Sequence, residues 1–279
     1  MSQKSNSSFE MLRSALTHQM EMGVSEVVIG RQQMLDSVFP LSRRVAPSGK
    51  KVSMSEVFGV ELRSKTTPAK TLTLISPQKM STTAAAPSTP LTQDSVYKSL
   101  EQHFNAIDEC QLCPLWTTRN KLVYGSGNPN ARLLIIGEAP GAEEDRTGKP
   151  FVGRAGQLLD KILAAVELSR DEVYITNILK SRPPGNRDPQ PDEVKSCLPY
   201  LHEQIRLIKP KLILALGRIA GQTLLHTNTP LGKLRSTWHD YHGVPLIVTY
   251  HPAALLRFPA YKKETWADMQ MLKARYDTI

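Results

Sequence analysis

Residues 132–153 read RLLIIGEAPGAEEDRTGKPFVG, and this stretch decides the fold class. Its first six residues form a short apolar run that ends in glycine, which is typical of a buried parallel strand. Similar runs follow at 173–176, 211–217 and 245–250, and segments with helical spacing of apolar residues separate them. Strands that alternate with helices indicate an α/β fold with a doubly wound, mostly parallel sheet of four strands.

The same pattern predicts where a ligand binds. In a doubly wound sheet, ligands lie beyond the carboxyl ends of the strands. The loops that begin at Gly137, Asn177, Gly217 and His251 follow those ends in this chain. We therefore expect the functional residues in these four loops.

The first of these loops is acidic. Glu138, Glu143, Glu144 and Asp145 lie within eight positions after the first strand. They are consistent with a solvated acidic turn or with a Mg²⁺ site, because clustered carboxylates suit hard cations. Phe151 follows just before a predicted helix, where it is either a core residue or a stacking platform.

The other loops are basic or contain histidine. Lys180, Arg182 and Arg187 follow the second strand, in a loop of prolines and glycine that either contacts phosphates or is simply solvated. His251 ends the last strand and precedes a proline, a position suited to electrostatic work. Next to Arg257, the apolar residues 254–256 either cap the core or insert into a base stack.

Composition bounds the class of protein. The chain has 279 residues and a formal charge of +9, and 40% of its residues are hydrophobic. Such a composition is ordinary for a globular protein, and the basic excess favours a polyanionic partner. No apolar run approaches the length of a membrane span, the first residues do not read as a signal peptide, and three cysteines make a disulfide framework improbable. We therefore expect an intracellular protein without a membrane partner.

The charge and the patterning divide the chain into three parts. Residues 1–92 have 11 basic and 6 acidic side chains but little periodicity. Within them, residues 64–92 are rich in Ser, Thr, Pro and Ala, a composition that cannot bury enough surface to fold. The sequence therefore predicts a weakly ordered basic segment at 1–63, a linker at 64–92 and one folded domain at 93–279. Residues 1–92 together are also the predicted site of a protein partner.

The motifs of this domain resemble those of the family-4 uracil-DNA glycosylases, the iron–sulfur branch of that superfamily. GEAPGAEEDRTGKPFVGRAGQLL, VYITNILKSRPPGNR, LALG and TYHPAALLR occur in the order of the family. The resemblance covers nearly all of residues 93–279 and none of residues 1–92. It implies a three-layer α/β/α sandwich that removes uracil from DNA and leaves an abasic site. It also implies a monomer in a bacterial cytoplasm, associated with the nucleoid.

The resemblance assigns roles to residues of this chain. Asn177 would read the edge of a flipped uracil and Phe151 would stack on its ring, while His251 would stabilise the departing uracil anion. Either Glu138 or Glu144 would supply the carboxylate that orients water or stabilises the sugar cation. The remaining roles fall to Ala139, which lines the substrate site where another branch has an aspartate, and to the DNA-contacting residues Arg182, Arg187, Leu255, Leu256 and Arg257.

The cysteines depart from the pattern of the family. That family holds a [4Fe–4S] cluster with four cysteines, and this chain matches three of them with Cys110, Cys113 and Cys197. The fourth position is Ser181, and an alcohol is a poor replacement for a soft thiolate. The cluster could be kept with Ser181 or water on one iron, reduced to a three-iron form, or lost. A zinc site is a poorer fit, since no histidine has a suitable spacing.

Three other functions compete with this one. A non-catalytic DNA-binding or polymerase-associated adaptor would lack residues such as Asn177 and His251, and this chain has both. The covalent uracil-binding branch has a basic insertion after the second motif, and residues 183–193 leave no room for it. A metal-dependent hydrolase would use the carboxylates at 143–145 and would be sensitive to chelators.

Overall fold

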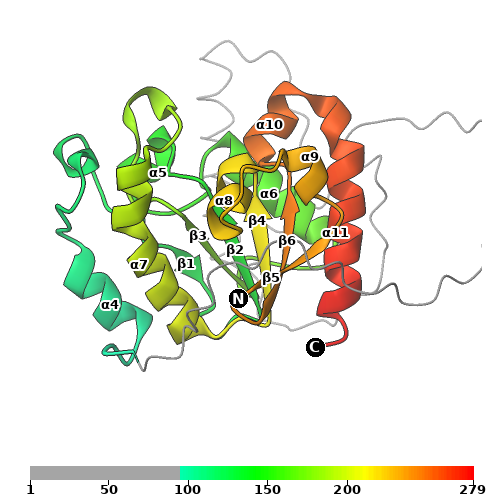
Figure 1. Ribbon diagram of the computed structural model, residues 1–279, viewed down its shortest axis with the longest axis horizontal. Coiled ribbons are helices and arrows are strands. Elements are labelled where there is room, and N and C mark those ends of the chain that lie inside the picture. The colour runs from blue at the N-terminus through cyan, green and yellow to red at the C-terminus, as the bar shows by residue number, and fades with distance from the viewer. Residues whose placement is uncertain (1–94) are drawn as a thin grey trace, which may run out of the picture. The chain divides into compact units, whose positions relative to one another are not determined.

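The computed structural model describes residues 95–279, so the predicted weakly ordered segment at 1–63 and the whole predicted linker at 64–92 lie outside the described residues. This part of the chain forms one mixed sheet with helices on both faces (Figure 1). Its strands lie in the order β1-β3-β2-β4-β6-β5. Their bounds are β1 (Ser126–Gly127), β2 (Leu133–Gly137), β3 (Val173–Asn177), β4 (Leu212–Leu216), β5 (Trp238–Tyr241) and β6 (Val244–Thr249).

The four central strands run parallel, as the apolar runs predicted. β2 pairs with β3 on one side and with β4 on the other, and β4 pairs with β6. The register places Gly137 opposite Asn177 at the carboxyl ends of β2 and β3. Two loops with predicted functional residues therefore start side by side.

The prediction of four strands was wrong, because each edge of the sheet has one more strand. β1 is two residues long and pairs antiparallel with β3, so it is too short to show a period in the sequence. β5 pairs antiparallel with β6 through a tight turn, in which His242 and Gly243 have φ angles of 52° and 85°. Two successive positive φ angles are typical of a hairpin turn that matches strand twist. β5 reads WHDY, which has no apolar run to reveal it.

The helices divide between the two faces of the sheet. Buried residues of α6 (Arg154–Ala165), α10 (Pro252–Arg257) and α11 (Lys262–Tyr276) pack on one face. Those of α7 (Pro191–Ile208), α8 (Arg218–Leu224) and α9 (Leu231–Leu234) pack on the other. The remaining helices are α4 (Leu100–Ile107), which precedes the sheet, and α5 (Ala142–Thr147), which follows β2. The resulting three layers confirm the predicted α/β/α sandwich.

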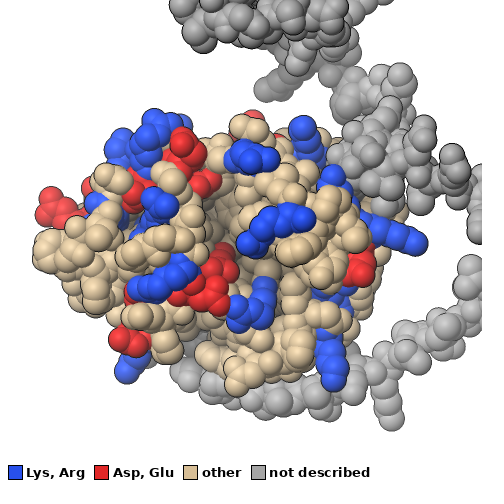
Figure 2. Space-filling view, turned by 90° about the horizontal axis from the view of Figure 1, so that it is seen from above, with Lys and Arg blue, Asp and Glu red and all other residues tan. Residues whose placement is uncertain are grey.

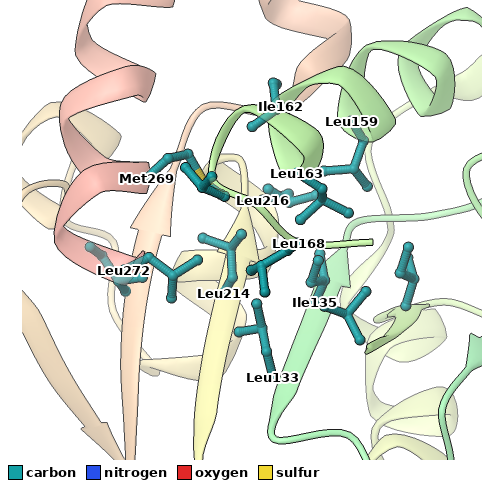
Figure 3. Packing of buried hydrophobic residues seen from close by; sticks show 14 of the residues in the cluster. Leu133, Ile135, Leu159, Ile162, Leu163, Leu168, Leu214, Leu216, Met269 and Leu272 are labelled. Atoms are coloured by element: carbon teal, nitrogen blue, oxygen red, sulfur yellow. The ribbon is translucent and has the colours of Figure 1, made fainter. Parts of the chain in front are cut away.

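Successive side chains of each central strand point to opposite faces of the sheet and so contribute to both layers of the core. Leu133 and Ile135 belong to the core cluster of the α6 and α11 layer, together with Leu163 and Leu272 (Figure 3). Leu134 belongs to the opposite cluster. All five residues of β2 are buried, so burial on both faces explains why the strand reads as a continuous apolar run. Residues 95–279 contain no helix that is both long and apolar enough to cross a membrane.

Candidate active site

The site begins where β2 and β3 end. A Cβ atom on Gly137 would lie 2.3 Å from Oδ1 of Asn177 and 2.6 Å from Cζ of Phe151. No real side chain tolerates such distances, so only glycine leaves the space between these two groups open. Gly137, Asn177 and Phe151 therefore line one small region at the carboxyl edge of the sheet.

Asn177 has a free polar atom in this region. Its side chain is buried, with 1% of the residue exposed, and Oδ1 has no hydrogen-bond partner among the described residues. A buried carbonyl oxygen without a partner costs free energy, so native proteins rarely leave one unpaired. An unpaired acceptor at the edge where the fold binds ligands indicates a site for a donor group of a substrate.

The backbone holds Phe151 in an unusual conformation. Its φ angle is 52°, a left-handed conformation that bulky residues seldom adopt. A Cβ atom on Gly156 would lie 1.9 Å from the Phe151 carbonyl oxygen, and the Arg170 guanidinium donates a hydrogen bond to that oxygen. The ring of Phe151 is buried and lies 5.5 Å from the ring of His251, at an interplanar angle of 32°. The structure therefore brings together the aromatic ring, the histidine and the asparagine that the sequence predicted for the site.

His251 has a defined tautomer. It follows β6 and caps α10, where its Nδ1 accepts a hydrogen bond of 3.2 Å from the backbone N–H of Ala253. Burial lowers the pKa of His251 to about 4, an effect that Arg257 reinforces and Glu144 opposes. The ring is therefore neutral near pH 7, and its single proton lies on Nε2 because Nδ1 is an acceptor. Nε2–H can donate to a ligand.

Glu138 differs from the other carboxylates of its loop. Burial raises the pKa of Glu138, the negative charge of Asp188 raises it further, and Arg218 opposes both. Within residues 95–279, no hydrogen bond or ion pair engages its side chain. A half-buried carboxylate without a partner is available to a water molecule or to a developing positive charge.

Glu144 is used by the protein itself. Its Oε1 accepts hydrogen bonds from the backbone N–H groups of Val152 (2.8 Å) and Gly153 (2.9 Å), and its Oε2 accepts one from Gly141 (3.1 Å). These contacts join the two halves of the loop around Phe151. The arrangement makes Glu144 a brace for the loop and leaves Glu138 as the free carboxylate.

The other acidic residues also have separate partners. Glu143 pairs with Arg146, and the buried Asp145 accepts hydrogen bonds from Asn120. Three of the four carboxylates thus have separate partners and Glu138 has none among residues 95–279, which does not match the cluster that a Mg²⁺ site would need. Ala139 is half-buried and packs against the cluster of the α7 layer.

The predicted DNA-contacting residues fall into two groups. Arg182 and Arg257 are half-buried and exposed, respectively, and Leu256 is 42% exposed. By contrast, the guanidinium of Arg187 donates two hydrogen bonds to the buried carboxylate of Glu193, which gives it a structural partner. Leu255 is 0% exposed and belongs to the core, so the predicted Leu255–Leu256 wedge is corrected to Leu256 alone. The helical spacing that turns Leu256 outward turns Leu255 inward.

Basic side chains surround a hollow at the carboxyl edge of the sheet, and acidic side chains lie in the wall of this hollow (Figure 2). Seen from above, where α9 and α10 lie over the sheet in Figure 1, the face is hollowed near its middle. Lys and Arg side chains lie on both sides of the hollow, and Asp and Glu side chains lie in its wall (Figure 2). Such a rim suits a polyanion whose reacting group enters between the basic side chains.

Comparison with known proteins decides the family. A family model described as the uracil DNA glycosylase superfamily matches residues 124–270. The chain belongs to this superfamily. It is 42% identical over 183 residues to a type-4 uracil-DNA glycosylase of Pyrobaculum aerophilum, covering 62% of this chain and 92% of that protein. It is 44% identical over 177 residues to a type-4 enzyme of Saccharolobus solfataricus, covering 60% and 82%. The resemblance to family 4 is thereby confirmed.

The cysteines of this uracil DNA glycosylase domain gather only in part. Cys197 belongs to the buried cluster of the α7 layer and Cys113 packs against that cluster, whereas Sγ of Cys110 lies 3.1 Å from Oη of Tyr200. The Oγ atom of Ser181 accepts a hydrogen bond of 3.3 Å from Nη1 of Arg119.

Among residues 95–279, no three His, Cys, Asp or Glu side chains are placed to hold a metal ion. The fourth donor is an alcohol beside a guanidinium cation, so these residues do not fit a four-thiolate cluster.

Substituting Ser181 with cysteine tests this conclusion. The Ser181→Cys variant restores the fourth thiolate, so we expect anaerobically purified variant to bind more iron than wild type and to gain the visible absorbance of an iron–sulfur cluster. Iron content and absorbance of the two proteins, prepared side by side, measure the effect. A full complement of iron in the wild type would contradict the prediction.

Several residues of this glycosylase site were missed by the sequence analysis. Gly137 was identified only as the end of a strand, and its role in leaving space for ligand emerged from the register. Gly156 lies within the first motif but had no predicted role, and Arg170 lies outside every motif, yet both hold the backbone of Phe151. A single sequence does not reveal that Gly156 must lack a side chain so that the carbonyl group of Phe151 can lie against it. Lys180 was quoted for its charge on the surface, but it is buried.

Proposed function

We propose that this chain is a DNA repair enzyme that hydrolyses the N-glycosidic bond of uracil in DNA, releasing uracil and leaving an abasic site. The single observation that supports this best is the unpaired, buried Oδ1 of Asn177 beside the ring of Phe151. The names and the 42–44% identity of the type-4 relatives point to the same activity. A non-catalytic adaptor is not favoured, because the groups that the chemistry needs are present.

Base recognition follows from the chemistry of the asparagine amide. Uracil presents a donor at N3–H and an acceptor at O4, and Oδ1 of Asn177 accepts from the first while its Nδ2 donates to the second. Cytosine presents an acceptor at N3 and an amino donor at C4, so the same amide would face like groups. A base reaches this depth only when it is flipped out of the duplex, and the ring of Phe151 then offers a surface for stacking.

Bond cleavage needs help at both ends of the breaking bond. As the C1′–N1 bond lengthens, its electron pair moves into the uracil ring, and the Nε2–H of His251 donates to the carbonyl oxygen that gains charge. The sugar becomes cationic, and Glu138 stabilises it or orients the water that adds to C1′. The water oxygen bonds to C1′ and the proton that the water loses ends on the uracil anion, so the products are free uracil and the abasic sugar. Arg182, Leu256 and Arg257 would hold the distorted DNA.

The proposal is tested by alkaline cleavage of labelled oligonucleotides that differ at one base. We expect the wild-type protein to yield strand breaks at uracil, and none at thymine or cytosine in the same position. Binding of the uracil oligonucleotide without any alkali-labile product would refute the activity and would favour the adaptor.

The lowered pKa of His251 predicts how the stability of the protein depends on pH. Its pKa in the folded protein is about 4, below the ordinary value of 6.5, so the unfolded chain binds more protons between these values. The contribution of His251 to stability is therefore present above about pH 6.5 and is lost as the pH falls toward 4. We expect the melting temperature of wild type to fall more between pH 7 and pH 5 than that of His251→Gln. Equal decreases in the two proteins would contradict a buried neutral histidine.

A further inference from the structure

A lysine lies buried under the base-recognition site. Lys180 is three residues beyond Asn177 and is only 1% exposed, and burial lowers the pKa of its ammonium group to about 7. Its Nζ donates three hydrogen bonds of 2.7 Å each, to Oγ1 of Thr176, to the backbone oxygen of Asn177 and to Oε1 of Gln204. Three acceptors match the three N–H donors of an ammonium group and offset the cost of its burial.

The acceptors around Lys180 are themselves held in place. Oγ1 of Thr176 donates to the backbone oxygen of Tyr124 (2.8 Å), and Nε2 of Gln204 donates to the same oxygen (2.8 Å). These bonds fix which side of each group faces the lysine. The network therefore spans β3, α7 and the segment before β1, and one of its three bonds ends on the backbone of Asn177.

The backbone beyond Asn177 is also attached on its other side. The N–H of Ile178 donates to the oxygen of Gly137 (2.9 Å), and the N–H of Leu179 donates to the oxygen of Glu138 (3.0 Å). The carbonyl of Asn177 thus lies between the end of β2 and the ammonium group. Its unpaired Oδ1 can meet a base in one place only if this backbone does not move.

We propose that Lys180 is a positioning residue for uracil recognition, which holds the backbone of Asn177 so that its amide meets the flipped base in productive geometry. The proposal rests on the proposed function of the site. It differs from a role in DNA binding, because the ammonium group is buried and cannot reach a phosphate. It also differs from a merely structural role, because its effect must pass through Asn177.

The direct test is the rate of uracil release at saturating enzyme, where binding of DNA no longer limits the reaction. We expect Lys180→Met, which keeps the length of the chain but removes the donors, to lower this rate by about 10²-fold, the loss that a small misplacement of a reacting group produces. The affinity for uracil-containing DNA should stay close to that of wild type. Ile205→Ala in the same layer of the core is the matched control, and we expect it to lower the melting temperature but not the rate.

A double variant distinguishes action through Asn177 from general damage. If Lys180 acts by positioning Asn177, then Lys180→Met should slow wild type but should not slow the Asn177→Ala variant further. Effects that multiply in the double variant, or a wild-type rate for Lys180→Met, would overturn the proposal. Should Lys180→Met not fold, Lys180→Gln removes the charge and at least one donor, and the same comparison applies. Absence of uracil release by wild type would refute the proposed function instead.

Discussion

Substituting Asn177 with alanine is expected to lower the rate of uracil release by about 10²–10³-fold, the loss seen when an enzyme is deprived of one preorganised hydrogen-bonding group. The amide is the one side chain of the site that can read both N3–H and O4 of the base. Its Oδ1 is already desolvated in the free protein, so it gains a partner only when uracil arrives. Single-turnover kinetics at saturating enzyme measure the effect.

The expected loss concerns recognition of the flipped base, so affinity for the DNA backbone should change little. Asn130→Ala is a suitable control, because Asn130 is exposed and lies in the loop before β2, at the amino end of the sheet. We expect this control to match wild type in both rate and affinity. An Asn177→Ala variant that releases uracil at the wild-type rate would refute the assignment of the base-reading residue.

Replacing Glu138 or Glu144 of the first loop with glutamine is expected to shift the melting temperature in opposite directions. Glu138→Gln should lower the rate of uracil release by about 10²-fold or more, as loss of a positioned acid–base group does. It should also raise the melting temperature at neutral pH. Because burial and Asp188 raise the pKa of Glu138, its contribution to stability is present at low pH and is lost as the pH rises above its ordinary value of 4.5. The ionised carboxylate therefore destabilises the folded protein at pH 7.

Glu144→Gln is the matched comparison. The carboxylate of Glu144 accepts three backbone N–H groups on its two oxygens. A glutamine amide has only one oxygen, and its NH2 group cannot accept, so at least one of these donors loses its partner. Loss of a hydrogen bond to a charged group costs about 1.5–3 kcal/mol, so we expect a lower melting temperature and a smaller loss of rate than with Glu138→Gln. Melting curves and single-turnover rates of the two variants decide between the carboxylates. A catalytic defect confined to Glu144→Gln would reverse the assignment.

Much of the fold could be predicted, because the four central strands are buried on both faces. Burial of this kind leaves continuous apolar runs such as 132–137, and the carboxyl ends of such strands define the ligand edge. The edge strands could not be found in this way. β1 has only two residues, and β5 reads WHDY, in which Trp238 and Tyr241 pack against the two core clusters without forming a continuous apolar run.

The sequence predicts those site residues whose place relative to the strands and helices already indicates their role. Asn177 and His251 lie at or just after strand ends and Phe151 lies just before α6, and the structure brings the three together. Burial and partners, by contrast, depend on contacts far along the chain. Glu138 and Glu144 look equivalent in the sequence, and only the backbone amides at 152–153 make the second one a brace. The sequence places Lys180 in a basic surface loop, but in the structure its side chain is buried and donates a hydrogen bond to Gln204 of α7.

Asn177, Phe151 and His251 together form the site that we propose excises uracil. The most direct measurement is the amount of free uracil released from a duplex with a single uracil, determined by mass spectrometry with wild-type protein in excess over DNA. We expect about one equivalent of free uracil, matched by abasic sites in the DNA, and no base released from the thymine control. Tight binding of the uracil duplex without release of the base would contradict it.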